Sequence, residues 1–191
     1  MRLRFRLPPI WWLFPIPDRP VQFYPTPRDD TVLQQLEGVP FVVFAVAAGL
    51  PDRDVPPETT ERLLRDVLER GYRPVFTGRS YERFGRREYQ PAAPALNLID
   101  ELSVPGVARL LELSCGIVTC HSALSMLAWC VRKPQLLLYP PSVREGHIAR
   151  RDQWAFGIDF PECRHCVFDD LRLQALTEEF LEIIAQSGVS G

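Results

Sequence analysis

The sequence carries little net charge and no long apolar run, and each absence excludes a class of partner. The formal net charge is −2 over 191 residues, and the basic residues are scattered apart from a small cluster at Arg2, Arg4 and Arg6. Isolated clusters of this size usually lie on a solvated surface, so no nucleic-acid partner is predicted. No segment reaches the roughly 18 continuous apolar residues that a membrane-spanning helix needs. We therefore expect no membrane span.

The first 17 residues imitate a signal peptide only in outline. An apolar stretch at residues 10–14 follows the arginines, but prolines at positions 8, 9, 15 and 17 interrupt the region and no small-residue cleavage site follows. A cleaved signal is therefore disfavoured, and a cytoplasmic location is predicted.

Motifs for common cofactors and metals are also missing. The chain has neither a Gly-x-Gly-x-x-Gly fingerprint nor a Walker loop, which disfavours a dinucleotide enzyme or an ATPase. Cys163, His165 and Cys166 offer three zinc ligands, whereas a structural site needs four. The five cysteines are an odd number, unsuited to a closed disulfide framework, so those in apolar stretches are expected to be buried thiols in a reducing compartment. The sequence predicts neither a metal nor a cofactor.

What is present is an alternation of short apolar runs and helical-period segments from Phe41 onward. Strands are expected at residues 41–48, 73–77, 95–99, 115–119, 135–139 and 166–168. Helices are expected at residues 58–70, after a Ser103 cap, at 121–132, and at 178–186 after a Thr177 cap. Strands separated by helices predict right-handed crossovers. The fold class is therefore α/β, a single Rossmann-like, doubly wound parallel sheet.

Residues 1–36 differ from the rest of the chain in composition. They carry many prolines and few helix signals, and are predicted to form an N-terminal arm, with residues 37–191 forming the domain. The arm also holds an aromatic cluster: Trp11, Trp12, Phe14, Phe23 and Tyr24. These side chains are expected to pack over the domain or against a protein partner.

Three loops follow expected strands, where an open parallel sheet binds its ligands. They are Gly49–Pro57, Gly78–Arg79 and Cys120–Ala123. The third runs directly from a buried strand into a helix, so the N–H groups of Ser122, Ala123 and Leu124 should point at the cleft, a favourable arrangement for a phosphate. Ser122 is equally well explained as a plain helix cap, and the two roles are compatible.

Three basic or titratable side chains flank the expected cleft. Arg53 and Arg79 are candidate phosphate ligands because a guanidinium matches phosphate geometry. Arg53 lies between two aspartates, however, so a surface ion pair is an alternative explanation. His121 either contacts the ligand or caps its turn. Together with Gly49, Gly78, Ser122 and Ala123, these residues form the predicted phosphate-binding site, in which no catalytic residue is identified.

The order of these pieces resembles the C-terminal domain of glycosyltransferase family 9, the heptosyltransferase family of lipopolysaccharide assembly. The matching pieces include residues 71–78 (GYRPVFTG), Asn97-Leu98, Val107 to Leu111 and Gly116 to Pro134, within a likeness that runs from about residue 40 to 187. The resemblance implies half of a GT-B fold, whose C-terminal domain binds a nucleotide-sugar donor without requiring a metal.

The family pattern is only partly kept. The family's phosphate-binding lysine corresponds to Arg53, and its Asp-Ser/Thr-Gly-x-x-His signature falls on residues 121–126. There His121, Ala123 and Met126 replace the aspartate, the glycine and the histidine, and only the hydroxyl of Ser122 is kept. In the family the catalytic base comes from an N-terminal acceptor domain, which 36 proline-rich residues are not expected to form.

Three functions stay open from the sequence. The first is a glycosyltransferase-like domain that binds the diphosphate of a nucleotide-sugar donor and receives its acceptor domain from another chain. The second is a non-catalytic structural or interaction module, derived from such an enzyme and part of a larger assembly. The third is an unrelated small-molecule enzyme on the same scaffold, because a fold alone does not fix chemistry.

Overall fold

The computed structural model describes residues 22–49, 51–80, 94–142 and 161–188. Their core is a six-stranded sheet in the order β3-β2-β1-β4-β5-β6, in which every neighbouring pair is parallel. The strands are β1 (Phe41–Ala45), β2 (Arg73–Gly78), β3 (Leu96–Ile99), β4 (Gly116–Cys120), β5 (Gln135–Tyr139) and β6 (Cys163–Val167). This order confirms the expected doubly wound α/β fold.

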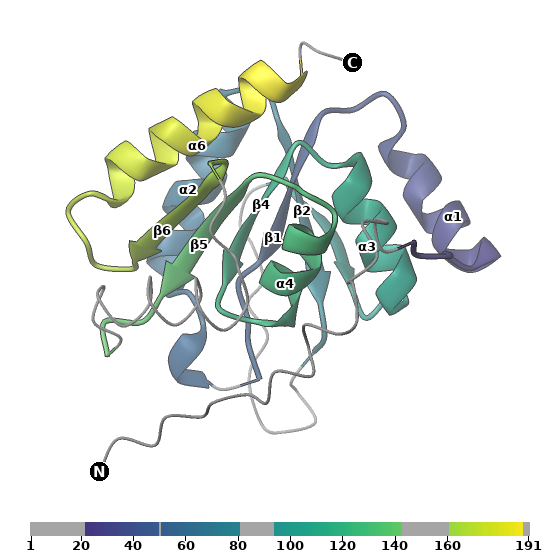
Figure 1. Ribbon diagram of the computed structural model, residues 1–191, viewed down its shortest axis with the longest axis horizontal. Helices are drawn as coiled ribbons and strands as arrows, with labels where there is room; N and C mark the ends of the chain where they lie inside the picture. Colours follow the sequence, from purple (N-terminus) through teal and green to yellow (C-terminus); the bar gives the residue numbers. More distant parts are fainter. Residues whose placement is uncertain (1–21, 50, 81–93, 143–160, 189–191) are drawn as a thin grey trace, which may run out of the picture.

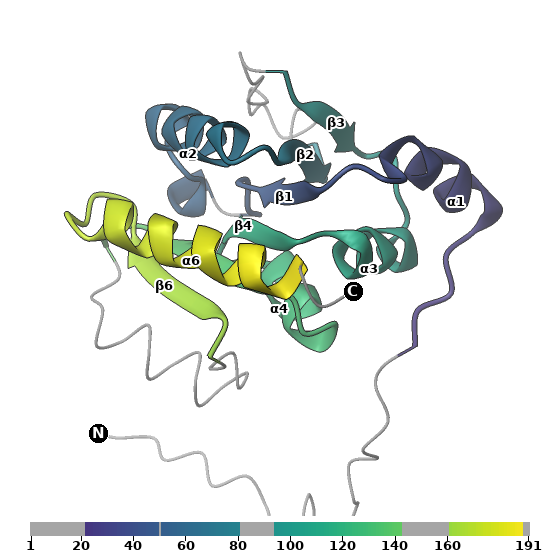
Figure 2. The same cartoon turned by 90° about the horizontal axis from the view of Figure 1, so that it is seen from above.

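Helices cover both faces of the sheet. One face carries α2 (Pro57–Glu69) and α6 (Leu173–Gly188), and the other carries α1 (Pro27–Leu33), the 3₁₀ turn η2 (Gln34–Leu36), α3 (Val104–Leu113) and α4 (Ala123–Cys130) (Figures 1 and 2). Alternate strand residues serve the two faces: Val42 and Phe44 of β1 pack with the α2 and α6 side, whereas Val43 and Ala45 pack with the α1 and α3 side. Because both faces are buried, the central strands are continuous apolar runs.

Two expected strand boundaries shift by three residues, and the others by no more than one. β1 ends at Ala45 rather than at residue 48, because the chain leaves the sheet there and enters the loop that carries the 3₁₀ turn η3 (Pro51–Arg53). β6 begins at Cys163 rather than at Cys166, since it pairs with the whole of β5 from Gln135 to Tyr139. Pairing with a neighbouring strand, rather than local composition, sets these ends.

The final helix shows that the Thr177 cap was wrong. α6 begins at Leu173, and Thr177 lies inside it, with its hydroxyl donating to the Leu173 carbonyl oxygen at 2.7 Å. Asp170 closes the turn that precedes α6, because its carboxylate accepts from the Arg172 N–H at 2.8 Å and its carbonyl accepts from the Leu173 N–H at 3.0 Å. A threonine inside a helix can bond the carbonyl one turn back, so it is an ambiguous start signal.

The proline-rich N-terminal region contains a helix that the sequence analysis missed. Thr26 caps α1 with a reciprocal capping box that uses Asp29, and Pro27 occupies the first turn. Leu33 and Leu36 are buried in the core with α3 residues. Residues 27–36 are therefore packed onto the sheet, whereas the tryptophans of the predicted arm lie outside the described residues.

Asp29 links α1 to α3. Its side chain is 1% exposed and accepts from the N–H and hydroxyl of Ser103, at 2.9 and 2.7 Å, as well as from Thr26. Ser103 is also the N-cap of α3, because its Oγ accepts from Gly106 N–H at 3.1 Å. Burial acts to raise the pKa of Asp29, but the hydrogen bonds from Ser103 and Thr26 outweigh it and hold that pKa well below its usual range.

Candidate functional site

A cavity of about 570 Å³ opens where β1, β2 and β4 end. It lies at the reversal of strand order between β1 and β4, the position at which α/β sheets bind ligands. Its lining includes all seven residues predicted for the phosphate site: Gly49, Arg53, Gly78, Arg79, His121, Ser122 and Ala123. Three loops far apart in sequence are therefore brought to one wall, as the parallel sheet requires.

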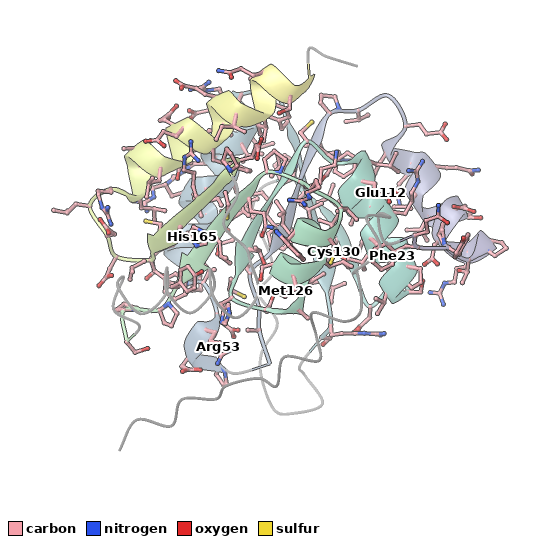
Figure 3. All side chains as sticks on the ribbon, viewed as in Figure 1. Phe23, Arg53, Glu112, Met126, Cys130 and His165 are labelled. Atoms are coloured by element: carbon pink, nitrogen blue, oxygen red, sulfur yellow. The ribbon has the colours of Figure 1, made fainter. Side chains whose placement is uncertain are left out.

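The loop after β1 is held in shape by hydrogen bonds within the loop. Val55 N–H donates to the Val46 carbonyl at 2.9 Å, and the Asp54 carboxylate accepts from Ala48 N–H at 2.8 Å. These bonds fold η3 back over the end of β1 and place Arg53 at the cavity, half-buried (Figure 3). Asp54 thus bonds to the loop, and within the described part of the chain Arg53 forms no ion pair.

The loop after β4 leads directly into α4. Thr119 is fully buried and its hydroxyl donates to the Ala45 carbonyl at 3.3 Å, which ties the end of β4 to the end of β1. Ser122 then caps α4, with its Oγ accepting from Leu124 N–H at 3.3 Å. The expectation that Leu124 N–H faces a ligand was therefore wrong, because the cap occupies it. Among the described residues, the N–H groups of Ser122 and Ala123 have no hydrogen-bond partner.

The loop after β2 contributes a more exposed cation. Gly78 has φ +138°, a conformation that side chains disfavour, and the next residue, Arg79, lies 3.4 Å from the Asp100 carboxylate with its side chain 66% exposed. Asp100 in turn accepts from Ser80 N–H at 3.1 Å. An exposed pair at this distance contributes little to stability. The Asp100 pair therefore leaves the Arg79 guanidinium at the cavity rim largely in solvent.

His121 lines the cavity between Cys120 and Ser122 and stacks on Tyr139 at the end of β5, with ring centroids 5.8 Å apart. Cys120, its neighbour, is fully buried. Burial, reinforced by the Asp54 carboxylate, raises the pKa of the Cys120 thiol to about 12. A thiol that stays protonated at neutral pH is a poor nucleophile, so Cys120 and His121 do not form a catalytic pair.

The cysteines near the C-terminus do not form a metal site. Cys163 and Cys166 lie three apart on β6, so they face opposite sides of the sheet, and they pack in different apolar clusters. Across the described ranges no group of three or more His, Cys, Asp or Glu side chains is arranged to hold a metal ion.

The other end of the cavity is apolar, and the sequence analysis missed it. Leu102, Val104 and Val107 line it from the start of α3, and Leu124, Leu127 and Cys130 line it from α4. Val104 is 62% exposed. In sequence these positions read as ordinary core-facing helix residues, so no local signal separates a cavity wall from a core. Met126, which stands where the family pattern has histidine, also lines the cavity (Figure 3).

The described helices include none that is both long and apolar enough to cross a bilayer.

Comparison with solved structures gives the same fold. The structure of Escherichia coli ADP-heptose LPS heptosyltransferase II matches with a TM-score of 0.65 at 19% identity, over 92% of this chain and 56% of that one. E. coli heptosyltransferase WaaC with ADP matches with a TM-score of 0.59 at 20% identity, over 81% and 48% of the two chains. A family 9 glycosyltransferase from Veillonella parvula DSM 2008 matches with a TM-score of 0.57 at 13% identity, over 85% and 49%.

These matches also show how much of each solved structure the chain covers. It spans about half the length of the solved structures that it resembles. Comparison with the sequences of curated proteins finds no significant match. The family model of glycosyltransferase family 9 (heptosyltransferase), in contrast, matches residues 21–151, which include α1 and all three loops of the cavity. The chain therefore belongs to glycosyltransferase family 9.

Proposed function

We propose that the chain is the donor-binding part of a glycosyltransferase and that its cavity holds the diphosphate of a nucleotide sugar. The observation that carries the proposal is the convergence of Arg53, His121 and the start of α4 on one cavity at the carboxyl edge of the sheet. Backbone N–H groups and the positive end of a helix favour a phosphate at such a place, and a guanidinium binds phosphate oxygens in pairs.

The charge of the cavity supports an anionic ligand. Arg53 and Arg79 line it, and none of its described lining residues is acidic. Arg53 is half-buried, and a cation that loses part of its hydration is stabilised by a ligand of opposite charge. A diphosphate between the α4 amides and Arg53 would supply that charge. The volume of the cavity, about 570 Å³, falls within the range of small-molecule sites.

The apolar end fits the rest of such a donor. The side chains of Val104, Val107 and Leu127 offer carbon surface on two facing helices, which suits the flat face of a nucleobase better than a sugar hydroxyl. The similarity to a heptosyltransferase solved with ADP supports the same assignment. We therefore propose that the diphosphate lies at the first residues of α4, beside Ser122 and Ala123, and that the nucleoside lies between α3 and the rest of α4.

The transfer step itself needs groups beyond this cavity. A general base must reach the acceptor hydroxyl, and no carboxylate is among the described residues that line the cavity. His121 carries the one imidazole among the described residues that line it. Because the chain spans about half of its structural relatives, we propose that a second domain supplies the acceptor site and the base.

Calorimetric titration tests the donor site. The full chain should bind ADP, or another nucleoside diphosphate, with a dissociation constant below 1 mM. Arg53→Ala should weaken binding by about 10-fold or more, the loss of a charge-assisted hydrogen bond. Arg65→Ala, an exposed arginine on α2, is the matched control and should change nothing. No binding of any nucleoside diphosphate at millimolar concentration would overturn the proposal.

The second candidate is a non-catalytic interaction module, and one observation favours it. His121, Ala123 and Met126 all line the cavity, so the departures from the family signature change the contact surface itself. This candidate predicts a stable protein partner for the aromatic N-terminal segment. Deleting residues 1–21, which precede α1, should then release the partner, and unchanged assembly after the deletion would count against it.

A further inference from the structure

A row of four side chains runs from the cavity wall to the edge strand β6. His121 lines the cavity and stacks on Tyr139 of β5, with ring centroids 5.8 Å apart. Tyr139 stacks in turn on His165 of β6, centroid to centroid at 5.9 Å, and the Tyr139 hydroxyl lies 3.0 Å from Nδ1 of His165. Nε2 of His165 lies 3.3 Å from Sγ of Cys163. Figure 3 labels His165, the third side chain of this row.

The register of the sheet produces the row. β5 and β6 are parallel, with Leu137 opposite His165 and Tyr139 opposite Val167. Because side chains alternate along a strand, Tyr139 and His165 stand on the same face, diagonal to one another. The Tyr139 side chain is 3% exposed and packs in a cluster with Leu137, Cys163, Val167, Met126 and Trp129. A ring buried this deeply presents a fixed plane to its neighbour.

We propose that Tyr139 and His165 are positioning residues, which hold the His121 imidazole in one orientation at the cavity wall so that it can donate a hydrogen bond to a bound phosphate. The identity of the ligand rests on the proposed function. His121 lies in a loop, where a side chain unsupported by packing samples several rotamers. A ring held before the ligand arrives loses less entropy on binding.

The polar contacts of the row work in either direction. When Cys163 S–H donates to Nε2, Nδ1–H of His165 donates to the Tyr139 oxygen. When Tyr139 O–H donates to Nδ1, Nε2–H donates to the Cys163 sulfur. Either arrangement ties the Tyr139 hydroxyl to the His165 ring. His165 also lies beyond residue 151, where the family match ends, so this support comes from outside the matched segment.

A double-mutant cycle on ADP binding tests the coupling. His121→Ala and Tyr139→Leu should each weaken ADP binding by about 10-fold. The double variant should bind no more weakly than His121→Ala, because Tyr139 acts only through His121. Tyr139→Phe keeps the ring and should lose less than Tyr139→Leu. Arg164→Ala is the matched control, since Arg164 is the neighbour of His165 on β6 but pairs with Glu179 of α6, and it should leave binding unchanged. Additive losses in the double variant would overturn the proposal.

A second measurement needs no ligand. The chain has three histidines, so the imidazole NMR signals can be assigned with single substitutions. Relaxation of the His121 ring should report greater mobility in Tyr139→Leu and in His165→Ala, but not in Arg164→Ala. His165→Ala carries the test if Tyr139→Leu fails to fold. A His121 ring that is equally ordered in these variants and in the natural chain would overturn the proposal. If the ring becomes mobile in the variants but the natural chain does not bind ADP, only the proposed function is overturned.

Discussion

The helices α3 and α4 lie on the same face of the sheet and both begin with a serine N-cap, Ser103 and Ser122. At α3 the Asp29 carboxylate accepts from the Ser103 N–H and hydroxyl. At α4 the corresponding space is the cavity, and none of its described lining residues is acidic. Both helix ends attract an anion. The chain supplies one from its own sequence at α3, and at α4 we propose that the ligand supplies it.

The largest expected effect comes from removing the internal anion. Asp29→Ala removes the buried carboxylate that accepts four hydrogen bonds from Ser103 and Thr26, and should lower the free energy of unfolding by about 3 kcal/mol or more. Asp30→Ala, the exposed neighbour on α1, should cost less than about 1 kcal/mol. Urea unfolding of the two variants measures both values. Similar losses of stability in the two variants would mean that Asp29 contributes only through its charge in the first turn of α1.

The same contact sets a pH dependence. The folded-state pKa of Asp29 lies below the unfolded value, so the unfolded chain binds more protons as the pH falls through the unfolded value of about 4. The stabilisation by Asp29 is therefore complete above that pH and declines below it. Urea midpoints between pH 5 and pH 2.5 should fall more steeply for the natural chain than for Asp29→Asn. Parallel profiles would contradict the assignment.

A smaller loss of stability is expected at Gly106 of α3, which contacts the Asp29 carboxylate. A Cβ on Gly106 would lie 2.3 Å from Oδ1 of Asp29, so Gly106→Ala should destabilise the fold by about 1–3 kcal/mol, although alanine is the better helix former. Gly49→Ala is the control, because nothing lies within 4 Å of a Cβ at that position. Equal melting temperatures for Gly106→Ala and the natural chain would show that α1 yields to the added methyl group.

The substitution with the smallest expected effect on the free energy of unfolding places a carboxylate at the start of α4, as Asp29 does at the start of α3. Ser122→Asp should leave stability within about 0.5 kcal/mol, since aspartate and serine cap helices comparably. Its carboxylate should nevertheless weaken ADP binding by about 10-fold through repulsion. Ser122→Asn caps equally well without the charge, and should bind ADP more tightly than Ser122→Asp does. Calorimetry that finds the two variants alike would show that no anion binds at this end of α4.

The sequence predicts a feature well where the residues of a single strand or a single helix cap determine it. The strand at residues 135–139 and the Ser103 cap were both predicted and are both found. The sequence also predicted which three loops would meet, because the carboxyl ends of parallel strands share one edge. Features set by packing were missed: α1 was hidden by its prolines, and its capping box uses aspartate where glutamate is usual.

The site shows the same division. Arg53 and Ser122 lie in the loops that follow β1 and β4, and position along the chain is enough to predict that these loops line the cavity. Val104 and Leu127 were missed because apolar helix residues have the same spacing whether they face a core or a cavity. The support of His121 by Tyr139 and His165 depends on the register of β5 with β6, which no local pattern contains.

The strand order has a consequence for how this cavity tolerates substitution. From β1 the chain crosses over through α2 on one face, and from β4, its neighbour, it crosses through α4 on the opposite face. The two connections diverge, and their divergence opens the crevice between them. The crevice therefore results from the strand order and not from the side chains that line it. Substituting a lining residue such as Met126 changes the contacts available to a ligand, but the crevice remains.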